Sequence, residues 1–266
     1  MERREFLSRA FASVMGLGLG WPAWGRAQAI YPEPGLKIPE RPSFFFAQVK
    51  YGNSLDWNPY HTAARSFMEV LIRRTSIPAS TDRVDIKLAD PRIFHYPFLY
   101  LTGAREFKPF SNSAIENIKR FLNYGGFLLV DDALALPGGG FEGSFQREVS
   151  RIFPGKTMSR LPDDHTVYQS YYLIDWVVGR KAVRPYLLGM DQEDRTVLIY
   201  CPNDLGGAWA KDSFGTWINR VEPGGQRQRE MAIRLGINIM LYALTVNYKK
   251  DLIHVPFISE RRRRRP

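Results

Sequence analysis

Residues 125–132 read Gly-Gly-Phe-Leu-Leu-Val-Asp-Asp, and this stretch decides the fold. Its four central residues are all apolar, as in a central strand of a parallel sheet that has helices on both faces. A glycine commonly ends the helix that precedes such a strand. We therefore expect a buried strand over residues 127–130 that is followed directly by two carboxylates, Asp131 and Asp132.

The segments on either side of this stretch alternate between strand and helix patterns. Short apolar or alternating runs predict further strands over residues 44–49, 98–101, 186–190 and 196–200, and an edge strand over 84–88. Helical spacing predicts one helix that starts at Pro59 behind an Asn58 cap, a second with a Ser113–Glu116 capping box, and two more around 141–153 and 226–245. This alternation indicates an α/β domain with a mostly parallel sheet and helices on both faces.

The first 29 residues have the pattern of an export signal. Arg3-Arg4 is followed one residue later by Phe6-Leu7, as in twin-arginine signals, and a moderately apolar stretch leads to the small-residue cleavage site Ala27-Gln28-Ala29. We predict a twin-arginine-type signal peptide over 1–29, either cleaved or kept as an anchor, and a periplasmic or secreted protein. A Pro-rich linker over 30–43, an α/β domain over 44–250 and a C-terminal extension over 251–266 complete the expected organisation.

The net charge of +10 is concentrated at the two ends of the chain. Residues 1–29 carry +2 and the five arginines at 261–265 carry +5, which leaves +3 for the rest. A nearly balanced body does not favour nucleic acid as a partner, and none is expected. We interpret the arginine tail as a solvated end. The alternative is contact with an acidic membrane surface, through the tail or through an uncleaved leader.

Ligands of open parallel sheets bind beyond the carboxyl ends of the strands. The candidate residues for such a crevice are Tyr51, Asn53, Gly103, Asp131, Asp132, His165, Asn203, Asp204 and Trp209. We expect Asp131, His165 and Asp204 to converge there. Each also has a structural interpretation, as a cap or a loop residue, and that interpretation is favoured for Asp132 and His165. No metal site or cofactor is assigned.

Cys201 is the single cysteine, so no intramolecular disulfide can form. It follows a predicted strand, but Pro202 and a predicted loop come next, in place of the helix that follows a nucleophile elbow. We interpret it as a packed thiol.

Several of these segments occur together in one known family. They are Tyr51-Gly52, 96–103, 125–132, Leu161-Pro162, Asp164-His165, 203–206 and 235–238. Over about residues 44–245 the chain resembles the bacterial domain of unknown function 4159. The resemblance implies a flavodoxin-like fold similar to that of class I glutamine amidotransferases. Those enzymes place a nucleophilic cysteine after a central strand, where this sequence has Asp131-Asp132-Ala133, so their chemistry is not carried over.

Two functional hypotheses follow. The first is an exported binding or assembly module with a degenerate amidotransferase-like fold and a protein partner in the cell envelope. The alternative is a periplasmic hydrolase, metal-assisted or not, that uses Asp131, His165 and Asp204. Convergence of these three side chains in one pocket would favour the enzyme.

Overall fold

The computed structural model describes residues 44–52 and 55–251, with side chains described as far as Thr245. The chain splits into two units, Met1–Glu40 and Arg41–Pro266. The predicted signal peptide and linker, the candidate residue Asn53 and the arginine tail lie outside the described residues. Within the described ranges, no helix has both the length and the apolar character that crossing a membrane requires.

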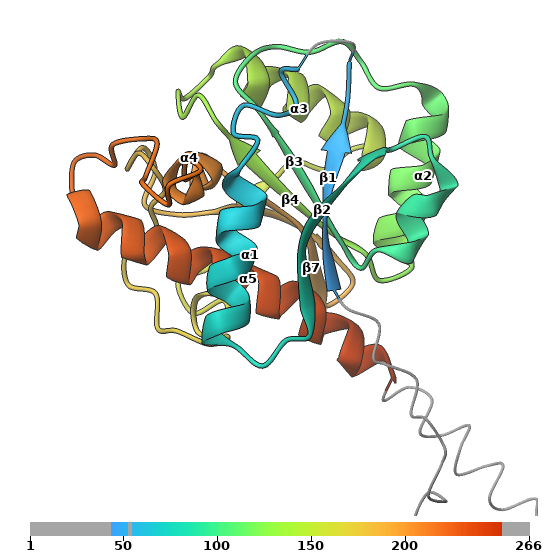
Figure 1. Cartoon of the computed structure of the whole chain (residues 1–266). Helices are drawn as coiled ribbons and strands as arrows, with labels where there is room; N and C mark the ends of the chain where they lie inside the picture. The colour runs from blue at the N-terminus through green and yellow to red at the C-terminus, as the bar shows by residue number, and fades with distance from the viewer. Residues whose placement is uncertain (1–43, 53–54, 252–266) are drawn as a thin grey trace, which may run out of the picture. The chain divides into compact units, whose positions relative to one another are not determined.

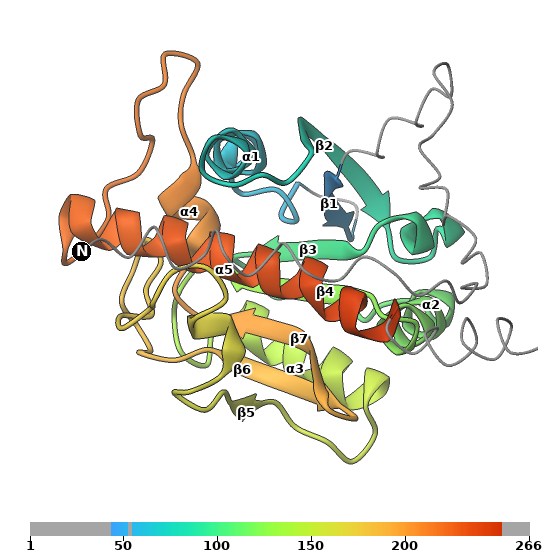
Figure 2. The same ribbon diagram turned by 90° about the horizontal axis from the view of Figure 1, so that it is seen from below.

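A seven-stranded sheet organises the domain, in the order β2-β1-β3-β4-β7-β6-β5 (Figures 1 and 2). The strands are β1 Phe44–Lys50, β2 Ala79–Lys87, β3 Phe98–Gly103, β4 Phe127–Asp132, β5 Ser159–Arg160, β6 Leu188–Gln192 and β7 Arg195–Cys201. The first five in the spatial order pair in parallel, whereas β6 and β5 are antiparallel additions at one side. The predicted α/β class with a mostly parallel sheet is confirmed.

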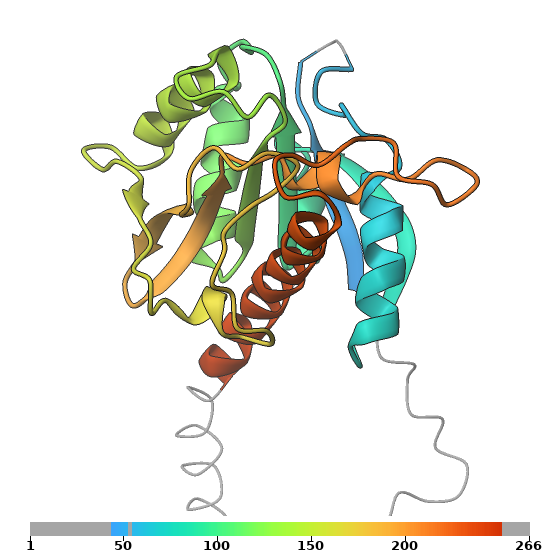
Figure 3. The ribbon, with the colours of Figure 1, turned by 90° about the vertical axis from the view of Figure 1, so that its left-hand side faces the viewer.

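Helices cover both faces of this sheet. They are α1 Ala63–Arg74, α2 Asn112–Asn123, α3 Gly140–Ile152, α4 Leu205–Trp209 and α5 Gly225–Asp251, with 3-10 turns η1 Pro91–His95 and η2 Thr166–Tyr168. One apolar cluster joins α1, α4 and α5 to one face, and a second joins α2, α3 and η1 to the other (Figures 2 and 3). Each face of the central strands is therefore a separate core.

The strand β4 divides its residues between these two cores. Phe127 and Leu129 belong to the cluster of α1 and α5, whereas Leu128 and Val130 belong to the cluster of α2 and α3. All six residues of β4 are buried. The strand runs two residues further than its apolar pattern predicts, because Asp131 pairs with Cys201 of β7 and Asp132 with Gly103 of β3.

Two predicted helix starts are wrong. The helix α1 begins at Ala63, behind Thr62 rather than Asn58. The Asn58 Oδ1 instead accepts a hydrogen bond from Arg83 Nη1 of β2 at 2.9 Å, and this contact holds residue 58 in the loop. In α2 the capping side chain is Ser111, whose Oγ accepts from Ala114 N at 3.2 Å, two residues before the predicted cap.

The region around β7 also differs from the sequence prediction. The strand β6 begins at Leu188, two residues later than expected, and is antiparallel to β7. The segment after Cys201, predicted as a loop, contains the short helix α4. Its glycines, Gly206 and Gly207, are poor helix formers, so local propensity gives no sign of it.

The crevice between the carboxyl ends of β1 and β3 is filled by an aromatic side chain. Parallel sheets of this kind offer a ligand space where neighbouring crossovers go to opposite faces, as those of α1 and α2 do here. The buried Tyr51 donates its hydroxyl to the Thr102 carbonyl at 3.0 Å. A Cβ atom on Gly103 would lie 1.9 Å from the Tyr51 hydroxyl and 2.8 Å from the Phe141 ring. Gly103 is thus needed for close packing.

We predict that Gly103→Ala lowers the free energy of unfolding by about 1–3 kcal/mol, because the added methyl group forces Tyr51 and Phe141 apart. The matched control is Gly143→Ala in α3, where an added Cβ meets nothing within 4 Å. That change should raise stability by up to about 1 kcal/mol, as alanine for glycine does in a helix. Denaturant unfolding of both variants measures the difference.

A double-mutant cycle with Tyr51→Phe identifies the cause of the lost stability. In a Tyr51→Phe background, Gly103→Ala should cost less, because the nearest colliding atom is absent. Equal costs in the two backgrounds, or a Gly103→Ala variant as stable as the Gly143→Ala control, would contradict the packing argument.

Candidate functional site

Two aspartates meet at the carboxyl edge of the sheet. Asp131, at the end of β4, is fully buried, and its Oδ1 accepts from Leu205 N at 2.8 Å. Its Oδ2 accepts from Gly206 N at 2.8 Å and from the Tyr100 hydroxyl at 2.7 Å. Backbone N–H groups in the first turn of a helix lack partners within the helix. The Asp131 carboxylate, at the end of β4, therefore accepts hydrogen bonds from two of these N–H groups.

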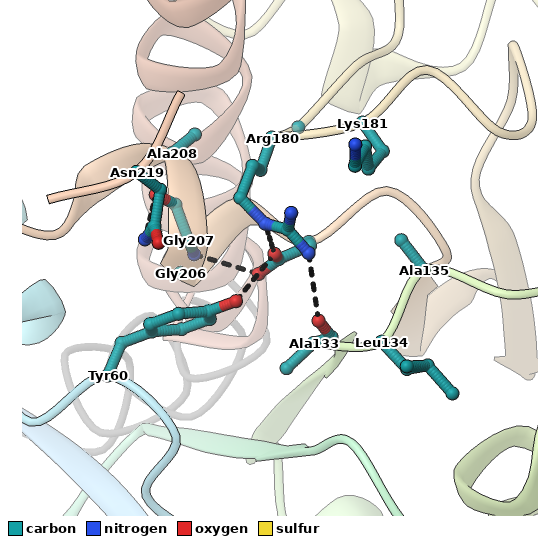
Figure 4. A network of polar contacts seen from close by, with 12 residues as sticks. Tyr60, Ala133, Leu134, Ala135, Arg180, Lys181, Gly206, Gly207, Ala208 and Asn219 are labelled. Carbon is teal, nitrogen blue, oxygen red and sulfur yellow. Dashed lines mark hydrogen bonds and ion pairs between the residues drawn. The ribbon is translucent and has the colours of Figure 1, made fainter. Parts of the chain in front are cut away.

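The second aspartate is Asp204, which caps the same helix. It has a left-handed backbone, with φ at 59°, and its Oδ1 accepts from Gly207 N at 2.8 Å. Its Oδ2 accepts from the Tyr60 hydroxyl at 2.9 Å and pairs with the Nε of Arg180 (Figure 4). The Arg180 Nη2 reaches on to the Ala133 carbonyl oxygen at 3.4 Å. The ends of β4 and β7 and the loop of Arg180 are thereby joined.

Burial raises the affinity of both carboxylates for protons, and the one guanidinium beside them acts in the opposite direction. Desolvation raises the pKa of Asp131 to about 6, against the opposing effect of its backbone hydrogen bonds. Desolvation, and then repulsion from Asp131, raises the pKa of Asp204 to about 7, whereas Arg180 acts to lower it. The pair therefore takes up a proton near neutral pH, where an ordinary aspartate has lost its own.

The neighbouring acid, Asp132, is a cap. Its Oδ1 accepts from Leu134 N and Ala135 N at 3.0 and 3.1 Å, and its Oδ2 accepts from the Tyr200 hydroxyl at 2.9 Å. Burial raises its pKa. These contacts fix the turn that leaves β4, which is the structural role favoured from the sequence.

His165 does not lie with the two aspartates. Its Nδ1 accepts from Val167 N at 3.1 Å, and its Nε2 lies 3.0 Å from the Oγ1 of Thr196. Thr196 is the second residue of β7, whereas Asp204 follows the end of that strand. The expected convergence holds for Asp131 and Asp204 and not for His165, which lies at the opposite end of β7. Burial lowers its pKa.

The remaining candidates serve the packing of the domain. The buried Asn203 accepts from Val183 N and Arg184 N through its Oδ1, and so holds that loop against the end of β7. Trp209 stacks on Phe67 with ring centroids 4.2 Å apart and lies in the core rather than in a crevice. Tyr51 and Gly103 close the space between β1 and β3.

The thiol of Cys201 and the described acidic side chains are not arranged as an activated nucleophile or as a cluster of metal ligands. The thiol is completely buried, and desolvation raises its pKa well above the ordinary value. Among the residues that the structure describes, no group of three or more His, Cys, Asp or Glu side chains is placed to hold a metal ion.

Three residues of this network were not identified from the sequence. Tyr100 points from β3, and Tyr60 comes just before α1. A buried strand tyrosine needs a polar partner, which could have drawn attention to Tyr100. Arg180 lies in an irregular segment 24 residues before Asp204, and no local pattern predicts that path.

We predict that the raised pKa values make stability depend on pH in a defined direction. The folded protein keeps protons that the unfolded chain releases between about pH 4 and pH 7, so the contribution of this pair to stability falls as the pH rises through that window. In Arg180→Gln the buried charge on Asp204 loses its partner. The variant should lose about 2–3 kcal/mol at about pH 8 and only about 1 kcal/mol at about pH 5.

Urea unfolding at the two pH values measures these losses. The control is Lys181→Gln, whose ion pair with Glu222 lies in solvent, and it should change little at either pH. An Arg180→Gln variant that is destabilised equally at both pH values would show that the charge on Asp204 is not what Arg180 compensates.

Sequence comparison places this architecture in a family. No curated protein matches the chain. A family model matches residues 45–244, from the second residue of β1 to Leu244 in α5, and it therefore covers the whole sheet and the aspartate network. The family is described as a domain of unknown function (DUF4159), and the chain belongs to it.

Proposed function

We propose that this protein is an exported, non-catalytic binding or assembly module of the cell envelope. One observation carries the proposal. Every side-chain oxygen of Asp131, Asp132 and Asp204 accepts a hydrogen bond from this chain itself. A general base also needs a lone pair that a substrate proton can reach, and these three residues are at most 2 % exposed. These carboxylates are instead occupied in holding α4 and the turn after β4.

The strand order supports a flavodoxin-like, amidotransferase-like origin for this module. The parallel strands follow the order β2-β1-β3-β4-β7, which corresponds to the 2-1-3-4-5 order of flavodoxin-like sheets. Where amidotransferases place their nucleophile after the central strand, this chain has Asp131, bound to the backbone of α4. The switch-point crevice is filled by Tyr51. The two positions where related folds carry small-molecule chemistry are the end of the central strand and the switch-point crevice. Both are used for packing in this chain.

We propose the loop over residues 211–218 as the contact surface for a protein partner. It follows α4 directly and projects from the domain (Figure 3). Its base is closed by a bridge between Lys211 and Trp217, and its turn is held by Asp212, whose Oδ1 accepts from Phe214 N at 2.9 Å. Phe214 is 92 % exposed at its tip. An ordered loop that presents a bare aromatic ring is typical of a contact residue in a protein interface.

A groove beside this loop widens the surface. It has a volume of about 600 Å³ and lies between the loop and the first two turns of α1. Arg65 and Glu69 from α1 and Lys211 and Asp212 from the loop line it. Charges of both signs around an apolar tip suit the polar rim of a protein interface. We propose a protein partner with an apolar pocket for Phe214.

The leader supports export as the route to that partner. We predict that Arg3→Lys with Arg4→Lys leaves the protein in the cytoplasm, because the twin-arginine pair is the recognised feature. The control is Arg9→Lys, which keeps the same net charge and lies outside the pair. Fractionation followed by immunoblotting measures the outcome. Periplasmic recovery of the double variant at the level of the control would refute twin-arginine export.

We predict that a photoreactive amino acid at position 214 gives one discrete protein adduct in intact cells, and that position 218 gives the same adduct. Ile218 is 50 % exposed on the same loop. Position 171 is the control. Tyr171 is as exposed as Ile218, but it donates its hydroxyl to the carbonyl oxygen of Arg74, the last residue of α1, whereas the groove lies against the first two turns of that helix. Adducts at 171 but none at 214 and 218 would contradict the proposed surface.

A further inference from the structure

Arg229 in α5 is a buried cation that no acidic side chain compensates. The residue is only 4 % exposed. Burial lowers the pKa of Arg229, and within the described part of the chain no carboxylate acts in the opposite direction. Its buried Nε has no hydrogen-bond partner among the same residues. A buried charge in this state costs free energy, so its position calls for a reason other than stability.

The guanidinium of Arg229 joins three parts of the structure. Its Nη1 donates to the Ala208 carbonyl oxygen of α4 at 2.6 Å, and its Nη2 donates to the Asn219 carbonyl oxygen, just after the 211–218 loop, at 2.6 Å. Its Cζ atom lies 4.4 Å from the ring centroid of Trp217 in the loop itself. An arginine fork reaches two acceptors at once in a fixed geometry. Arg229 therefore links α5, α4 and the base of the loop.

The base of the loop is closed around the same tryptophan. The Lys211 Nζ lies 4.4 Å from the Trp217 ring centroid, and Lys211 and Trp217 form an antiparallel bridge. Beside them, Ile218 N donates to the Ala210 carbonyl oxygen, directly after α4, at 3.1 Å. These contacts, together with those of Arg229, set the angle at which the loop leaves α4.

The tip of the loop is held by internal contacts. Asp212 Oδ1 accepts from Phe214 N at 2.9 Å and from Thr216 N at 2.8 Å, and Asp212 N donates to the Thr216 carbonyl oxygen at 2.8 Å. These bonds fix the shape of the turn, but they do not attach it to the domain. The direction in which the 92 % exposed Phe214 points therefore depends on the base of the loop, where Arg229 lies.

We propose that Arg229 is a positioning residue for the partner surface: it fixes the direction in which the 211–218 loop presents Phe214, and it does not itself touch the partner. The inference rests on the proposed role of this loop in binding a protein. A loop that is ordered before binding loses less conformational entropy when the complex forms. Specifying a single arrangement is one reason for which a fold keeps a buried charged group that costs free energy.

The change Arg229→Met tests this role in the purified full-length chain. Methionine fills much of the same space and removes both the buried charge and its two hydrogen bonds, so the urea midpoint of unfolding should change little. The amide of Ile218 at the base of the loop should exchange at least tenfold faster, whereas the exchange of the Leu129 amide in β4 should not change. A residue that only stabilised the fold would lower the midpoint and speed the exchange of both amides together.

Two further variants make the comparison specific. Arg227→Met removes an exposed arginine of the same helix that lies 6.0 Å from the ring centroid of Trp176, and it should leave the exchange of Ile218 unchanged. Arg229→Lys keeps the charge, but one ammonium group does not bridge the two carbonyl oxygens, so Ile218 should again exchange faster. If Arg229→Met does not fold, Arg229→Lys decides by itself. An Ile218 exchange rate that is unchanged, or that rises only as much as that of Leu129, would overturn the proposal.

Adduct formation in intact cells gives a readout that a purely structural role would not move. With the photoreactive amino acid at position 218, Arg229→Met should lower the adduct yield at least fivefold, and Arg227→Met should leave it unchanged. In a Phe214→Ser background, where the yield is already low, Arg229→Met should have little further effect, because both changes act through the same aromatic ring. An undiminished yield in Arg229→Met would overturn the proposal.

The two measurements distinguish this inference from the proposed function. Absence of any adduct from the native chain would count against the proposed function. The exchange rate of Ile218 is measured without a partner, so it decides separately whether Arg229 positions the loop.

Discussion

The structure depends on how two fully buried aspartates at the end of the central strands are compensated. Asp131 and Asp204 face the first turn of α4, where the N–H groups of residues 205–207 would otherwise lack acceptors. Arg180 and two tyrosine hydroxyls supply the remaining donors. A buried carboxylate without such partners would be strongly unfavourable, so β4, β7, α4 and the loop of Arg180 must be in place together.

This constraint gives the acids at the carboxyl edge of the sheet a structural role. In open parallel sheets the carboxyl edge is where chemistry is usually found. Here the same edge positions a five-residue helix and, beyond it, the projecting loop with Phe214. Tyr51 and Phe141 fill the neighbouring crevice against Gly103. Raised pKa values, a frequent mark of active sites, arise here from burial in a structural network.

Sequence patterns predicted the parts of this structure that depend on local periodicity. The apolar residues of β4 and the buried face of α1, with Phe67, Met68 and Leu71, follow directly from their spacing. The meeting of Asp131 and Asp204 follows from the shared direction of parallel strands. The position of His165 and the role of Arg180 depend on the path of an irregular segment, and α4 is specified by tertiary hydrogen bonds to its glycines rather than by propensity.

Amide hydrogen exchange tests whether Asp131 and Asp204 hold α4 as a part of the folded core. A five-residue helix with two glycines would fray readily by itself. If Asp131 and Asp204 hold it, the amides of Leu205, Gly206 and Gly207 should exchange as slowly as those of β4, through global unfolding. Rapid exchange of these three amides in the native protein would contradict the account, because the carboxylates would then be available to a ligand.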